Sequence, residues 1–254
     1  MIDLNNDIFD LERDYDREIY RILKDLSSLL RPYTTQIGLY QDIVVRFDTI
    51  QAKAQLAKQT RSTKPQLMQQ PHYKLQDVRH PLLLIKNQAT GIKTVPFDLH
   101  FAKEERILVL SGPNAGGKSV CMKAVGLLQL MLQSGMLISA REGSEIGIFD
   151  KIFADIGDQQ SLEDELSTYS SRLKNAQYFV QHADEKTLVL IDEFGSGTDP
   201  KMGGAIAEGI LKELNQKKSY GVITTHYSNL KVYAFENSGV INGCLLYTSP
   251  SPRD

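Results

Sequence analysis

The amino-acid sequence predicts an α/β fold with a mixed, largely parallel β-sheet, preceded by an α-helical hairpin. Two observations support this fold class. Apolar residues recur about every 3.5 positions within residues 1–60, as in helices, whereas strand and helix patterns alternate from Tyr73 to Gly243. Such alternation is typical of parallel sheets, because a crossover helix connects each strand to the next. We therefore expect a helical part at residues 1–70, an α/β domain at 71–243 and a tail at 244–254.

The helical part divides at Pro32, because proline interrupts the interior of a helix. One apolar series precedes this residue and another follows it, which predicts two helices joined as an antiparallel hairpin. Such a pair buries little apolar surface alone, so we expect it to pack on another element. We interpret its charged faces as solvated rather than as a binding surface. The two series are Ile8, Leu11, Tyr15, Ile19, Ile22, Leu26 and Leu29, and then Ile37, Tyr40, Val44, Phe47, Ile50 and Ala54.

The other segments are assigned from local composition. Residues 60–71 are polar and contain two prolines, which indicates a linker. A long helix is expected from Val120 to Leu137. Residues 244–254 lack periodicity, contain two prolines and resemble translated sequencing adapter, so we expect a disordered, non-native tail. Short β-like runs are Leu82 to Ile85, Thr94 to Phe101 and Ile107 to Leu110.

Bulk composition narrows the class of protein. The formal net charge is −2, so nucleic acid would have to bind through a local patch or a partner chain. The two cysteines, Cys121 and Cys244, suggest no disulfide framework and a reducing compartment, and we interpret Cys121 as a buried apolar residue. We find no secretory leader and no run of about 18 apolar residues, and we expect a cytoplasmic bacterial protein without membrane contact.

A glycine-rich loop is the most informative motif. Residues 111–119 read Ser-Gly-Pro-Asn-Ala-Gly-Gly-Lys-Ser, which contains the pattern G-x-x-x-x-G-K-S between an apolar strand and a helix. The backbone N–H groups of such a loop and the helix N-terminus bind phosphate. Lys118 can reach the β- and γ-phosphates, and the Ser119 hydroxyl can ligate Mg²⁺. The predicted nucleotide-binding residues here are Gly112, Pro113, Asn114, Ala115, Gly116, Gly117, Lys118, Ser119 and Val120.

An acidic motif supplies the second half of an ATP site. Residues 187–193 read Thr-Leu-Val-Leu-Ile-Asp-Glu, an apolar strand that ends in two carboxylates, as in a Walker B motif. Asp192 would hold Mg²⁺, directly or through water, opposite Ser119, and Glu193 would orient or deprotonate the attacking water. Residues 194–200 are small and flexible, and they fit either a loop at a nucleotide site or subunit contact or a simple turn.

Three further elements are candidates for the same site. His226 ends another predicted strand, where a neutral imidazole could bind a γ-phosphate and report its presence; we favour this role over a structural one. Gln160 could contact Mg²⁺ or the lytic water. The hydroxyls of Ser167 and Thr168 could cap a following helix, or that helix N-terminus could serve a γ-phosphate held by a second subunit.

These motifs, in this order, resemble the ATPase domain of the MutS family, which is related to the ABC-type ATPases. Residues 155–161 and 192–198 are similar to the MutS-two branch of that family rather than to its mismatch-repair branch. The resemblance covers about residues 1–243. Its other features are Asn114 in the glycine loop, Ser167-Thr168-Tyr169 where transporters have Leu-Ser-Gly-Gly-Gln, and Arg79-His80-Pro81 at the start of the domain.

The resemblance implies a P-loop ATPase that uses ATP and Mg²⁺ and works as a homodimer with composite sites. Lys118 and Ser119 would come from one subunit, and Ser167 and Thr168 from the other. Residues 1–70 would be returning helices of the lever and clamp, and the chain would be a fragment without the nuclease domain of full-length members. The adenine contact would lie near Ile92, where mismatch-repair members have an aromatic residue.

The resemblance also implies two functions. Members of the branch bind branched or structured DNA and are associated with limiting recombination, and some bind ribosomes and act on stalled or collided ones. We expect the first function, with contact to the ribosome and its RNA as the alternative. The Ser167-Thr168 signature argues against a transporter subunit. A nucleotide binder that does not hydrolyse ATP is disfavoured, because the sequence retains all four residues expected for hydrolysis: Lys118, Asp192, Glu193 and His226.

Overall fold

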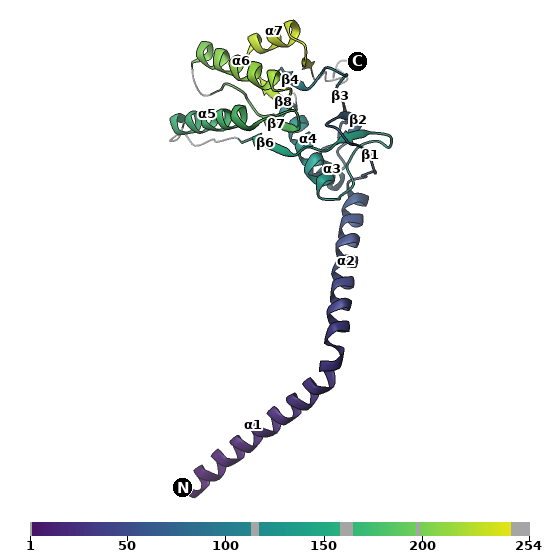
Figure 1. Ribbon diagram of the computed structural model, residues 1–254, viewed down its shortest axis with the longest axis vertical. Helices are drawn as coiled ribbons and strands as arrows, with labels where there is room; N and C mark the ends of the chain where they lie inside the picture. The colour runs from purple at the N-terminus through teal and green to yellow at the C-terminus, as the bar shows by residue number, and fades with distance from the viewer. Residues whose placement is uncertain (1, 113–116, 158–164, 197–198, 245–254) are drawn as a thin grey trace. The chain divides into compact units, whose positions relative to one another are not determined.

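The computed structural model describes residues 2–112, 117–157, 165–196 and 199–244 (Figure 1). The chain divides into two units, Met1–Gln55 and Leu56–Asp254. Within the described ranges, no helix combines the length and the apolar character that crossing a membrane requires.

The first unit is helical. Helix α1 (Ile2–Leu30) is joined to α2 (Thr34–Gln59) by a short 3₁₀ helix, η1 (Arg31–Tyr33), which contains Pro32. The two predicted helices and the break between them at Pro32 are confirmed. The large apolar side chains from Leu4 to Leu30 on α1, and on α2 as far as Ile50, are exposed. The two helices therefore bury little apolar surface by themselves, as expected from their sequence.

The second unit contains a parallel sheet of five strands in the order β6-β7-β8-β4-β9. All four neighbouring pairs are parallel. This arrangement confirms the α/β class and the largely parallel sheet that the alternating pattern predicted. The strands are β4 (Ile107–Ser111), β6 (Lys151–Asp155), β7 (Thr187–Ile191), β8 (Tyr220–Thr225) and β9 (Val240–Cys244).

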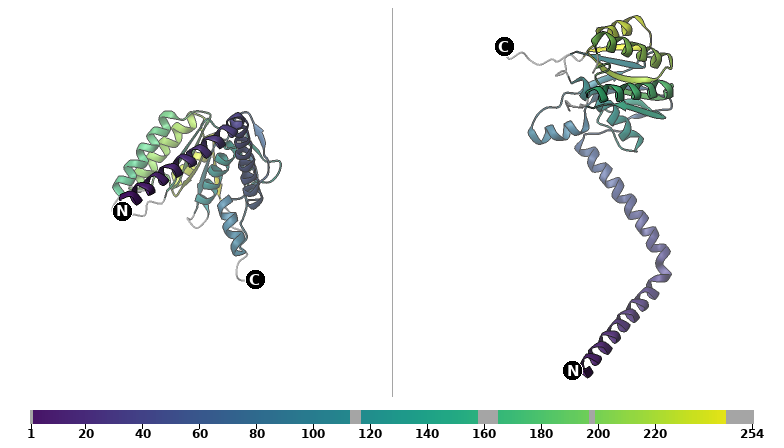
Figure 2. Two further views of the ribbon diagram at one scale, coloured as in Figure 1. Left: turned by 90° about the horizontal axis from the view of Figure 1, so that it is seen from below. Right: turned by 90° about the vertical axis from the view of Figure 1, so that its left-hand side faces the viewer.

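Alternate side chains of these strands enter two separate cores, because successive residues of a strand point to opposite faces. Leu108, Leu188 and Val222 pack with helix α4, whereas Ile107, Val189 and Ile223 pack with α5, α6 and α7. Helices therefore cover both faces of the sheet (Figure 2). The helices are α4 (Lys118–Gln133), α5 (Glu165–His182), α6 (Pro200–Gln216) and α7 (Ser228–Glu236).

A second sheet of four strands, in the order β1-β5-β2-β3, shares the core of α4. Its β1–β5 pair is parallel, and its other two pairs are antiparallel. The predicted strand at Thr94 to Phe101 corresponds to β3. The strands are β1 (Gln66–Met68), β2 (Tyr73–Val78), β3 (Phe97–His100) and β5 (Glu145–Gly147).

Two local predictions are wrong. The β-like run Leu82 to Ile85 belongs to helix α3 (Pro81–Thr90). Three residues set this helix: Nδ1 of His80 accepts the Leu83 N–H at its start, Pro81 occupies the first turn, and Gly91 ends it at φ 70°. The linker predicted at residues 60–71 contains β1, because it pairs with a strand far along the chain.

Cys121 on α4 is buried, as predicted, with 5% of its surface exposed. Burial raises the pKa of its thiol to about 12, so the thiol is an inert part of the core. The tail predicted to be disordered and non-native lies outside the described residues from residue 245 onward.

Candidate nucleotide-binding site

The glycine loop and the acidic motif meet at one edge of the five-stranded sheet. Strand β8 lies between β4 and β7, and all three run in the same direction. Ser111, the last residue of β4, pairs with Thr225, the last residue of β8. Because the carboxyl ends of these strands coincide, Gly112, Asp192 and His226 follow them at the same edge, which is where ligands bind in open α/β sheets.

The two described glycines of the loop have backbone conformations that favour glycine. Gly112 has φ 131°, and Gly117, which precedes α4, has φ 75°. In the described part of the chain, no side chain caps α4 at Gly117. The first N–H groups of this helix are therefore oriented for an acceptor such as a phosphate. Pro113, Asn114, Ala115 and Gly116 lie outside the described residues.

Lys118 is the first residue of α4 and is only 3% exposed. Its Nζ donates a hydrogen bond to the carbonyl oxygen of Gly112. Burial lowers the pKa of Lys118, and the carboxylates of Asp192 and Glu193 act in the opposite direction. A bound phosphate would bring further negative charge to this buried ammonium group and would stabilise its charged form.

Ser119 and Asp192 are in direct contact across the two motifs. The Ser119 hydroxyl donates to Oδ1 of Asp192 over 2.9 Å, and Asp192 is 4% exposed. A hydroxyl and a carboxylate are the hard oxygen ligands that Mg²⁺ prefers, and Mg²⁺ usually takes only one or two of them from the protein. These two residues therefore fit the predicted metal site.

Glu193 is held in a left-handed backbone conformation, with φ 51°. For a residue other than glycine, such a conformation costs about 1–3 kcal/mol and persists only where surrounding contacts determine it. The N–H of Glu193 donates to Oγ1 of Thr224 over 2.8 Å. The sequence had not indicated a role for Thr224 separate from His226, which lies two residues later.

The remaining predicted site residues are located only in part. His226 directly follows β8, as expected, and is exposed. Gln160 lies outside the described residues. Helix α5 begins at Glu165, so Ser167 and Thr168 lie inside its first turn and do not precede it as the capping interpretation assumed. Nothing of their side chains is described.

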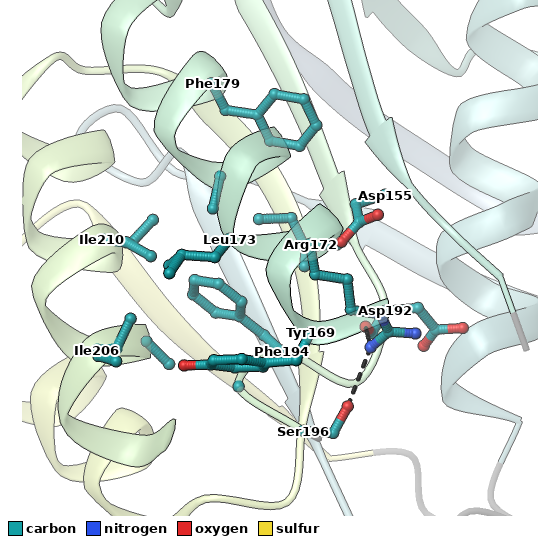
Figure 3. Close-up of a pocket in the computed structure, with 14 residues that line it drawn as sticks. Asp155, Tyr169, Arg172, Leu173, Phe179, Asp192, Phe194, Ser196, Ile206 and Ile210 are labelled. Carbon is teal, nitrogen blue, oxygen red and sulfur yellow. Dashed lines mark hydrogen bonds between the residues drawn. The ribbon is translucent and has the colours of Figure 1, made fainter. Parts of the chain in front are cut away.

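Sequence reasoning missed Arg172, which lies one helical turn after Thr168 on α5. Its guanidinium donates to Oγ of Ser196 over 3.0 Å (Figure 3). It also donates to the carbonyl of Gly157 over 2.9 Å and to the carbonyl of Asp192 over 3.4 Å. A single side chain therefore connects α5 to the segments that follow β6 and β7. The i, i+4 spacing from Thr168 is the signal that could have indicated it, because such residues share a helix face.

We expect Arg172→Lys to lower ATP turnover about 3- to 10-fold, because an ammonium cannot reproduce the planar fork that reaches three oxygens. The measurement is steady-state phosphate release. Arg141→Lys is the matched control, since Arg141 is an exposed arginine that contacts Gln76 and Asp77 elsewhere. Equal turnover in both variants would contradict a role for Arg172.

A small pocket lies behind Arg172, between α5 and α6 (Figure 3). It holds about 30 Å³, which is room for one or two water molecules and not for a substrate. The hydroxyl of Tyr169 is buried without a hydrogen-bond partner among the described residues. The apolar residues that line the pocket include Leu173, Phe179, Phe194, Ile206 and Ile210.

Gly195 shows that the segment after the acidic motif is tightly packed. It has φ 89°, and an added Cβ would lie 2.7 Å from the ring of Tyr227 and 2.9 Å from the carbonyl oxygen of Gly203. The Tyr227 hydroxyl donates to the Gly195 carbonyl over 2.9 Å. The conformation of this segment is therefore determined by α6 and by the residue that follows His226.

We expect Gly195→Ala to lower the free energy of unfolding by about 1–3 kcal/mol, through backbone strain and the clash with Tyr227. The free energy of unfolding is measured by urea denaturation, followed by circular dichroism. The control is Gly209→Ala on α6, where nothing lies within 4 Å of the added methyl group. We expect the control to be neutral or to gain up to about 1 kcal/mol. Similar losses in both variants would refute the packing argument.

A glycine loop that leads into a helix, with a buried lysine at the helix start and carboxylates on a nearby parallel strand, is the arrangement of P-loop nucleotide-binding proteins. The described part of the second unit therefore defines a P-loop domain.

Comparison with known proteins places this domain in a family. The model of MutS domain V matches residues 108–248. The Endonuclease MutS2 of Pediococcus pentosaceus is 42% identical over 245 residues, and that of Ligilactobacillus salivarius is 44% identical over 245 residues; both matches cover 96% of this chain and 30% of the relative. The Endonuclease MutS2 of Streptococcus sanguinis is 40% identical over 253 residues, which is 100% of this chain and 32% of the relative. The chain belongs to the MutS family, and within it to the MutS2 type. It spans about 30% of the length of the curated relatives it matches.

Proposed function

We propose that this chain binds and hydrolyses ATP with Mg²⁺, as the ATPase part of a MutS2-type DNA-binding protein. The observation that carries the proposal is the contact between the Ser119 hydroxyl and the Asp192 carboxylate, which joins the glycine loop to the acidic motif over 2.9 Å. A metal ion held at these oxygens would be positioned beside phosphates bound at the start of α4.

The roles of the other residues follow from their chemistry. Lys118 supplies a buried positive charge for the β- and γ-phosphates. Glu193 accepts a proton from the attacking water or orients it, since its carboxylate follows Asp192 directly. His226 serves as the γ-phosphate sensor. When bound, Mg²⁺ supplies charge stabilisation for the phosphoryl group.

The proposed working unit is a homodimer with composite ATP sites. Two features support it: membership of the MutS family and the position of Ser167 and Thr168 in the first turn of α5. A helix N-terminus carries partial positive charge, which would favour a γ-phosphate presented by the partner subunit. Gln160 is proposed to contact Mg²⁺ or the lytic water in the same site, and Ile92 to lie near the adenine.

For the substrate, we propose branched or structured DNA and a role in limiting homologous recombination. In this proposal residues 1–70 belong to the lever and clamp, and residues 71–243 are the ATPase domain that responds to them. The relatives carry the name endonuclease, whereas the chemistry proposed for the residues of this chain is ATP hydrolysis. Binding of ribosomes and their RNA, to rescue stalled or collided ribosomes, is the alternative.

The test is ATP turnover by the full chain over a range of protein concentrations, alone and with branched DNA or ribosomes. We expect the activity per subunit to rise with concentration, since composite sites form only in the dimer, and to rise further with branched DNA. Stimulation by ribosomes alone would favour the alternative. Activity independent of concentration would contradict composite sites, and no turnover under any condition would contradict the ATPase.

A further inference from the structure

Thr224, on strand β8, contacts both carboxylate residues of the proposed ATP site. Its hydroxyl donates to Oδ1 of Asp192 over 2.5 Å and accepts the N–H of Glu193 over 2.8 Å. Its backbone carbonyl accepts the N–H of Phe194 over 2.9 Å. The residue is 1% exposed, so water cannot replace these contacts without a change in structure.

The direction of both side-chain hydrogen bonds is determined by chemistry. A threonine hydroxyl carries one hydrogen, and a backbone N–H can only donate. The single hydrogen of Thr224 is therefore directed to the Asp192 carboxylate, while a lone pair receives the Glu193 N–H. A hydrogen bond to an ionised acceptor is stronger than one between neutral groups, so this contact orients the carboxylate firmly.

Oδ1 of Asp192 also accepts the hydroxyl hydrogen of Ser119. If the Ser119 oxygen is to bind a metal ion, its hydroxyl must change partners. The Thr224 hydroxyl is not itself a proposed metal ligand, so it can keep its partner and hold Asp192 in place during that change. The two hydroxyls therefore have different tasks, although they contact the same oxygen atom.

Thr224 also determines the backbone on both sides of Glu193. The N–H of Glu193 is bound by the side chain of Thr224, and the N–H of Phe194 is bound by its carbonyl. These two peptide groups flank the Cα of Glu193, whose φ of 51° is unfavourable for a residue with a side chain. Fixing both of them fixes the direction in which the Glu193 side chain leaves the backbone.

We propose that Thr224 is a positioning residue that orients Glu193 and Asp192 for ATP hydrolysis; the inference rests on the ATPase function proposed above. Thr224 acts through these two residues. The geometry links β8, the strand that directly precedes His226, to the proposed general base.

The test compares hydroxyl-free and hydroxyl-bearing variants of the full chain with ATP and MgCl₂. Thr224→Val has nearly the same shape but leaves the Glu193 N–H and one Asp192 contact unsatisfied. We expect its kcat to fall about 10- to 100-fold. This is less than the full contribution of a general base, because Glu193 is still present and only its orientation is disturbed. The KM for ATP should change less than about 3-fold, because the glycine loop and Lys118 are untouched. Thr224→Ser should restore kcat to within about 3-fold of the original chain.

The matched control is Thr225→Val. Thr225 is adjacent, equally buried and also hydrogen-bonded, but its hydroxyl donates to the carbonyl of Phe194 and accepts the N–H of Tyr227. We expect the Thr225→Val variant to have a lowered melting temperature, as the Thr224→Val variant should. Its kcat should stay within about 3-fold of that of the original chain. Thr224→Ala is a second hydroxyl-free variant if the valine variant does not fold.

The outcomes separate this inference from the proposed function. An unchanged kcat in the hydroxyl-free variants would overturn it, and so would a serine variant as slow as the valine variant or a Thr225→Val variant as slow as Thr224→Val. If the original chain shows no ATP turnover, the proposed function fails, and this inference fails with it.

Discussion

Replacement of Lys118 by alanine is expected to lower ATP turnover by at least about 100-fold, since it removes a preorganised charge at the phosphates. The side chain is 3% exposed and contacts the carbonyl of Gly112, so its ammonium group is held beside the glycine loop. Turnover is measured as phosphate release at saturating ATP, and binding with a fluorescent ATP analogue.

The same variant separates a functional role from a structural one. Burial lowers the pKa of Lys118, which means that the folded protein penalises its charged form. Without nucleotide, Lys118→Ala should therefore be no less stable than the original chain. With ATP, the original chain should gain thermal stability from ligand binding and the variant should not. Lys212→Ala, on the exposed face of α6, is the control. Unchanged turnover in Lys118→Ala would exclude the proposed site.

Glu193→Gln is expected to retain ATP binding and to lower hydrolysis by about 100- to 10,000-fold, the range that a general base contributes. Glutamine has the same length and the same backbone N–H, so the contact with Thr224 and the left-handed conformation should persist. Because the bound ATP is not consumed, the variant should accumulate in the closed dimer, which size-exclusion chromatography with ATP detects.

Glu213→Gln, on the exposed side of α6, is the control for the loss of one carboxylate. It should hydrolyse ATP at the original rate and show no ATP-dependent change in elution. A Glu193→Gln chain that elutes as a monomer with ATP present would contradict the composite-site dimer. Full activity in that chain would instead remove Glu193 from the proposed mechanism and leave nucleotide binding untouched.

Local patterns predicted a large part of this protein. The glycine loop, its preceding strand and its following helix are encoded in consecutive residues, because backbone conformation at Gly112 and Gly117 and the apolar run of β4 are local properties. The acidic motif is local in the same way, and so is the break at Pro32. The roles proposed for Lys118, Ser119, Asp192 and Glu193 were predicted from residue type and spacing alone.

Contacts between distant segments were decided only by the tertiary structure. Thr224 is 32 residues from Asp192 along the chain, and it reaches the carboxylate because β8 lies between β4 and β7. Strand β1 exists because β5 pairs with it, although residues 60–71 around it are mostly polar. Arg172 matters because the segments that follow β6 and β7 both lie beside it. Strand order, register and burial create these contacts, and each depends on the free energy of the whole packed domain. The sequence by itself therefore determined which residue types are available for the proposed chemistry, and the packing of the sheet decided which other residues contact them.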